Sequence, residues 1–176
     1  MEPLPHPPRD FREIVEADLR RAARLIITVQ DELDPQLRIA TPEGDYVIAV
    51  TLPADDFGRR TVLRALSTFM VWKQATAFTL ASVLFEPDCV YCAGISVQGA
   101  VGCLSRIRRS PRPWTAASFG KVEWLPAASI DPGIVELLPK APRPLTPKEV
   151  AACNKWFGTD GPFPAVHLPT GEVRGV

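Results

Sequence analysis

The chain has 176 residues, of which 46% are hydrophobic and 23% charged, a composition typical of one folded domain. Its 20 basic residues balance its 20 acidic ones, which argues against a general nucleic-acid-binding protein, because such proteins carry excess positive charge. No apolar run reaches the roughly 20 residues that span a bilayer. The N-terminus also lacks the basic and apolar regions of a signal peptide. These features predict a cytoplasmic protein without a membrane segment, and the arginine-rich composition is typical of a GC-rich bacterial genome.

The N-terminal part predicts an extended arm followed by a long helix. Four prolines fall within residues 1–8, and this segment is interpreted as an extended arm. From about residue 10 to 32, apolar side chains recur at helical spacing, which predicts an amphipathic helix. The helix is expected to end before Pro35, because the residue that precedes a proline avoids the helical conformation.

A hairpin and a second helix are predicted next. Two β-rich runs within 37–52 flank a short polar insert that contains a proline and a glycine, a combination typical of a hairpin turn. Asp55 or Asp56 can cap a helix over about 56–73, whose apolar face is broad.

Four short β-rich runs follow, joined by connections that are too short for anything but antiparallel hairpins. They lie at about 76–85, 89–98, 100–109 and 119–125. The first two runs are apolar on both faces, which is typical of central strands. Beyond residue 126 prolines are frequent, and short helices are expected at about 132–138 and 147–157, with irregular structure after Gly158.

The order of these elements, α-β-β-α-β-β-β-β-α, predicts an α+β fold. Its hairpin connections imply an antiparallel sheet of about six strands with the helices packed on one face. The expected organisation is an extended proline-rich arm at 1–8 and an α+β core domain at 9–126. A proline-rich C-terminal extension at 127–176 is expected to pack its short helices on that core.

Charge is balanced over the whole chain but not within its halves. Residues 1–88 carry 10 basic and 14 acidic groups, whereas residues 89–176 carry 10 basic and 6 acidic groups. Between Asp88 and Glu123 there is no acidic residue, while five basic residues fall there. Such an uneven distribution of charge favours self-association or an acidic partner, unless the two halves interleave in the fold so that their charges cancel.

The densest cluster of charge is the predicted anion-binding or partner-binding site. Its members are Arg106, Arg108, Arg109 and Arg112, with Trp114 beside them. Arg106 and Arg108 are expected to share one face of a strand, and the cluster can hold a phosphate, a carboxylate or an acidic partner. Trp114 can add a stacking surface for a nucleobase. The alternative is a solvated strand end whose charges protect the edge of a sheet.

Carboxylates at two other places are candidates for chemistry. Glu86 and Asp88 flank a proline at a predicted hairpin. An acid pair of this kind can carry out acid–base or metal chemistry. The alternative is that proline and aspartate are present because they are ordinary turn residues. Asp18 lies near the apolar stripe of the first helix. A buried, unpaired carboxylate there would have a raised pKa, whereas one at the margin of the stripe meets water or an arginine.

Neither the cysteines nor the histidines form a pattern that indicates a metal site, a redox site or a catalytic triad, and the cysteines are expected to pack in the core. Cys89 and Cys92 form a C-x-x-C pattern, but within a strand, where residues three apart point to opposite faces. His6 and His167 lack the neighbours of a catalytic triad. The aromatic residues around Trp156 are expected to pin the C-terminal segment to the core. No metal site and no cofactor are predicted.

The sequence favours a non-enzymatic interaction or accessory protein over an enzyme, because no catalytic motif is present. The expected partner is another protein or a second copy of the chain, reached through the sheet, the basic strand end and the proline-rich termini. The alternative is a small enzyme or ligand-binding domain that holds an anionic substrate between Arg106, Arg108 and Glu86 or Asp88. Nucleic-acid binding through the basic stretch 106–121 is the least favoured interpretation.

Overall fold

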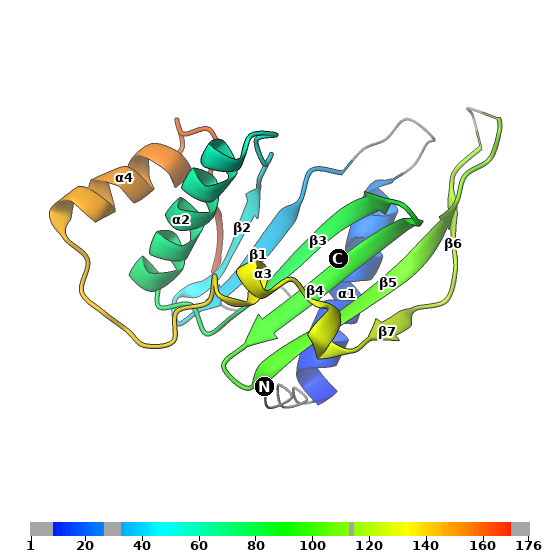
Figure 1. Cartoon of the computed structure of the whole chain (residues 1–176), viewed down its shortest axis with the longest axis horizontal. Coiled ribbons are helices and arrows are strands. Elements are labelled where there is room, and N and C mark those ends of the chain that lie inside the picture. The colour runs from blue at the N-terminus through cyan, green and yellow to red at the C-terminus, as the bar shows by residue number, and fades with distance from the viewer. Residues whose placement is uncertain (1–8, 27–32, 113–114, 170–176) are drawn as a thin grey trace.

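An antiparallel sheet with helices on both of its faces forms the centre of the structure (Figure 1). The computed structural model describes residues 9–26, 33–112 and 115–169. The helices are α1 (Arg9–Leu25), α2 (Asp56–Trp72), α3 (Pro132–Val135) and α4 (Pro147–Phe157), with a 3-10 turn, η1 (Ala127–Ser129), before α3. The strands are β1 (Gln36–Thr41), β2 (Gly44–Ala49), β3 (Ala77–Phe85), β4 (Asp88–Ser96), β5 (Gly99–Arg108), β6 (Ser118–Phe119), β7 (Glu123–Leu125) and β8 (Val166–Pro169). None of the helices within these segments has the length and apolar character that spanning a bilayer requires.

The strands lie in the order β6-β5-β4-β3-β1-β2-β8, and β7 pairs with β5. All the pairs are antiparallel, which confirms the predicted α+β class and its antiparallel sheet. The last predicted strand is divided into β6 and β7, because its pairing with β5 shifts by one residue between the pairs Ile107–Phe119 and Leu104–Glu123. The structure also contains β8, where irregular structure was expected.

The two faces of the sheet carry separate hydrophobic cores. On the face covered by α1, which we call the α1 face, Val15 and Leu19 pack with Cys92 of β4 and Cys103 of β5. The opposite face is the α2 face, and Figure 1 shows α1 behind the sheet, away from α2 and α4. The buried side chains on the α2 face include Ile39, Ile48, Leu66, Phe69, Phe78, Leu137 and Phe157.

The prediction that the helices share one face is therefore wrong. Successive residues of a strand point to opposite sides of the sheet. In β4, Cys92 belongs to the core under α1, whereas its neighbour Ala93 belongs to the core under α2. Strands that are apolar on both faces need a covering layer on each side, and α1 supplies the second one.

A buried polar network ties α1 to the sheet. Asp18, only 2% exposed, accepts hydrogen bonds from Thr79 Oγ1 of β3 at 2.6 Å and from Arg38 Nη1 of β1 at 3.1 Å. Arg38 donates its Nε–H to Asp45 of β2 at 2.6 Å. Desolvation opposes the charge of Arg38, but the carboxylates of Asp18 and Asp45 raise its pKa above the ordinary value. Asp18 thus joins α1 directly to β1 and β3, and through Arg38 also to β2.

The close approach of α1 to β4 depends on a glycine. A Cβ atom at Gly94 would overlap with Val15 Cγ2 and would lie 3.0 Å from the ring of Phe11. Both of these residues belong to α1, so the helix lies directly on the backbone of β4 at this point.

Replacing Gly94 by alanine is expected to lower the free energy of unfolding by about 1–3 kcal/mol, because the added methyl group pushes α1 away from β4. Gly102 is the matched control, since a Cβ atom there meets Ile130 and Tyr91 at an ordinary 3.6 Å. Denaturant unfolding of Gly94→Ala and Gly102→Ala measures the difference. Equal stability of the two variants would contradict this packing of α1.

Replacing Asp18 by alanine is expected to lower the free energy of unfolding by about 3 kcal/mol, because the half-buried Arg38 loses one of its two carboxylate partners. Glu16→Ala is the control, since Glu16 pairs with a largely exposed Arg20 at 2.6 Å and such pairs contribute about 1 kcal/mol or less. Urea unfolding gives both values. A cost for Asp18→Ala no larger than that for Glu16→Ala would show that the network does not hold α1 to the sheet.

Candidate functional site

The basic cluster and the acid pair that the sequence predicted lie together at one end of the sheet. The turn between β3 and β4 carries Glu86 and Asp88, and β5 ends beside it at Arg108. Arg109 donates to Asp88 through Nε at 2.7 Å and through Nη2 at 3.3 Å. Asp88 is therefore paired with an arginine, while Glu86 is exposed to solvent.

Three of the four predicted arginines are exposed. The side chain of Arg106 is 58% exposed and its Nε lies 3.6 Å from Glu123 of β7, which is longer than a hydrogen bond. Arg108 is exposed at the end of β5, and Arg112 is exposed in the loop that follows. Trp114, the proposed stacking residue, lies outside the described residues.

Apolar side chains adjoin the exposed arginines on the α2 face. The strand register sets Leu84 of β3, Cys89 of β4 and Arg106 of β5 in one row across the sheet. The next row contains Tyr91 and Leu104, both half-buried, and Leu84 is 41% exposed. Figure 1 shows this end of the sheet beyond α2 and α3.

We call this surface the open end of the α2 face. It consists of Leu84, Tyr91, Leu104, Arg106 and Arg108. It combines apolar contact area with two guanidinium groups, and each guanidinium group presents several N–H donors to a carboxylate. The surface can therefore bind a ligand that carries both acidic and apolar groups.

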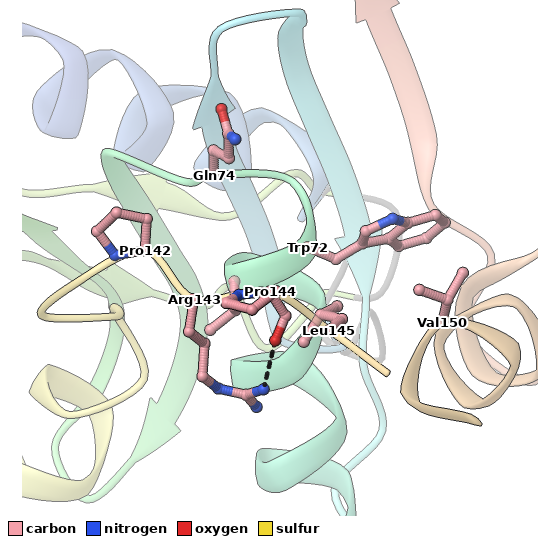
Figure 2. Close-up of a pocket in the computed structure, with 8 residues that line it drawn as sticks. Trp72, Gln74, Pro142, Arg143, Pro144, Leu145 and Val150 are labelled. Atoms are coloured by element: carbon pink, nitrogen blue, oxygen red, sulfur yellow. Dashed lines mark hydrogen bonds between the residues drawn. The ribbon is translucent and has the colours of Figure 1, made fainter. Parts of the chain in front are cut away.

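A broad hollow of about 450 Å³ lies between the end of α2 and the segment that leads into α4 (Figure 2). Trp72 and Val150 border it from the two helices. Arg143 also lines it but donates to Glu149 at 2.9 and 3.3 Å. The hydrogen bond from Arg143, with the backbone of Thr146, lowers the pKa of Glu149 to about 2. The pair of Arg143 and Glu149 thus holds the start of α4.

The four cysteines are buried free thiols. Cys89 and Cys92 point to opposite faces of β4, so their sulfur atoms do not converge. Burial raises the pKa of Cys92 well above its ordinary value, and that of Cys103, directly opposite on β5, to about 12. In the described part of the chain, no three His, Cys, Asp or Glu side chains form a group that could hold a metal ion.

The aromatic residues of the C-terminal segment pack against the core. Phe157 of α4 is 4% exposed and contacts the ring of Phe69 of α2, with 5.0 Å between the centroids. His167 of β8 stacks on Tyr46 of β2, with 4.6 Å between the ring centroids, and this contact supports the pairing of the two strands. His6 lies outside the described residues.

All four thiols are expected to resist alkylation by iodoacetamide at neutral pH in the folded protein. The reason is that burial raises the pKa of each thiol and removes the thiolate that reacts. Mass spectrometry should find all four modified after denaturation. Modification of Cys89 or Cys92 in the native state would show that the C-x-x-C pair is accessible.

No protein-family model, curated protein or solved structure matches this chain. Its function is therefore inferred from its own residues and their geometry.

Proposed function

We propose that the chain is a non-enzymatic interaction protein that binds an acidic segment of another protein at the open end of the α2 face. The row formed by Leu84, Cys89 and Arg106 is the observation that carries this proposal. It sets the exposed side chain of Leu84 two strands away from the exposed guanidinium group of Arg106, on a part of the sheet beyond α2 and α3. A partner with carboxylates and an apolar side chain complements both features.

Charge complementarity supports an acidic partner. This end of the sheet carries the basic residues Arg106, Arg108, Arg109, Arg112 and Lys121, and the acidic residues Glu86, Asp88 and Glu123. The strongest internal pair joins Asp88 to Arg109, and Arg106 and Arg108 remain exposed on the α2 face. Exposed ion pairs contribute about 1 kcal/mol or less each. The arginines would therefore set the partner and the association rate, while burial of Leu84 would supply affinity.

An interaction protein is favoured over an enzyme at this site. A small-molecule substrate needs a concave pocket with converging polar groups. The 450 Å³ hollow borders none of the arginines at the sheet end and neither residue of the acid pair. Nucleic acid is disfavoured by the zero net charge of the chain.

We also infer that the protein works in the cytoplasm of a bacterium. Four free cysteines suit a reducing compartment, where thiols do not form disulfides. The arginine-rich composition supports a bacterial source.

Reversing the charge of Arg106 and Arg108 is expected to weaken binding of an acidic peptide by about tenfold or more, because attraction becomes repulsion. The probe is a fluorescein-labelled peptide of glutamates with one leucine and one phenylalanine, and fluorescence anisotropy measures its affinity at low and high salt. The matched control is Arg60→Glu with Arg64→Glu, on the exposed side of α2. The control variant should bind the peptide as tightly as the unaltered chain. Added salt should weaken peptide binding by the control variant and by the unaltered chain.

Three outcomes of this experiment would overturn the proposal. The first is that the Arg106→Glu, Arg108→Glu variant binds the peptide as tightly as the unaltered chain does. The second is tighter binding of a single-stranded DNA oligonucleotide than of the acidic peptide, which would favour nucleic acid. The third is self-association of the unaltered chain, seen by sedimentation, that the same two substitutions abolish.

A further inference from the structure

A second concave site lies on the α2 face, between α2 and α3. It is a cavity of about 280 Å³ whose walls come from five parts of the chain: β1, the segment after β2, α2, β3 and α3. The apolar residues that shape it are Leu37, Leu63, Leu66, Leu80, Ile134 and Leu137. None of the five residues that define the open end of the α2 face lines it.

The cavity differs from the closely packed core around it. Protein interiors leave few voids larger than a water molecule, because empty space loses dispersion contacts. Leu63, Leu80 and Ile134 are nevertheless only partly buried, although they pack against the core of the α2 face. An apolar cavity of about 150 Å³ can take up benzene, so this larger one can hold an aliphatic chain or a small ring system.

Three polar side chains line the cavity, and of these Arg59 and Asp131 are exposed whereas Ser82 is half-buried. Asp131 accepts the backbone N–H of Gly133 at 2.7 Å and thereby caps α3. Arg59 is 46% exposed, donates Nη2–H to Ala54 O at 3.1 Å, and has Nη1 3.7 Å from Asp56, beyond hydrogen-bond length. A guanidinium group has five N–H donors, so Arg59 can still donate two hydrogen bonds to one carboxylate.

We propose that this cavity binds a small molecule with an apolar body and one carboxylate, such as a medium-chain fatty acid. The body lies among the leucines between α2 and α3, and the carboxylate pairs with the exposed Arg59. This site is separate from the surface proposed for the acidic protein partner, since the two share none of the residues that define them.

Decanoate, below its micelle concentration, is the probe, and isothermal titration calorimetry of the full chain measures its binding. Arg59→Gln should weaken decanoate binding by about tenfold, because a charge-assisted pair is lost. It should leave the binding of decanol, which has no charge, nearly unchanged. Arg60→Gln is the matched control, since Arg60 is an exposed neighbour that does not line the cavity. It should bind both compounds like the unaltered chain.

Filling the cavity tests where the apolar body lies. Leu63→Trp should abolish the binding of both decanoate and decanol, and Ile134→Phe, from the opposite wall, provides the same test if the first variant does not fold. Circular dichroism and the thermal midpoint establish that each variant is folded. The inference is overturned if the unaltered chain does not bind decanoate, or if a folded filled variant still binds it. Equal affinities of Arg59→Gln and Arg60→Gln for decanoate would also overturn it.

Discussion

Strand β4 is buried on both of its faces, and this burial determines how the other elements are arranged. Between Cys89 and Ile95 only Tyr91 is not fully buried, and alternate side chains enter different cores. Such a strand is stable only between two layers, so α1 must cover one face while α2 and its neighbours cover the other. Gly94 permits the close approach of α1, and Asp18 fixes the helix to the sheet through Thr79 and Arg38. Because the middle of the sheet is enclosed, the accessible features of the α2 face are its open end and the gap between α2 and α3.

The sequence predicted well those helices whose first and last residues are determined by capping residues beside them in the chain. The bounds expected for α4 agree with the structure because Thr146, Pro147 and Glu149 form a capping box with a first-turn proline. The side on which α1 packs is set by contacts distant in the sequence, and the two-sided apolar pattern of β3 and β4 was the signal for it. By contrast, β8 has only four residues and no usable periodicity. It exists because its backbone pairs with β2 and His167 stacks on Tyr46.

The candidate surface could be predicted in part from hairpin geometry. The β3–β4 turn and the end of β5 fall at the same edge of an antiparallel sheet, so Asp88 and the basic cluster had to be neighbours. Which arginine pairs with Asp88 depends on side-chain directions after the strand ends, and sequence spacing does not determine these. The cavity beside Arg59 could not be predicted at all, because its lining comes from segments between residues 35 and 137 that only the folded sheet brings together.

Nuclear magnetic resonance can locate the surface at which the acidic peptide binds, which we propose to be the open end of the α2 face. Amide ¹H–¹⁵N spectra of the full chain, recorded during titration with the acidic peptide, report binding residue by residue. Binding at this surface should shift the amides of Leu84, Tyr91, Leu104, Arg106 and Arg108 most and leave the amides of α1 unchanged. Shifts centred on α1 or on the walls of the cavity, or no shifts while the peptide binds, would contradict it.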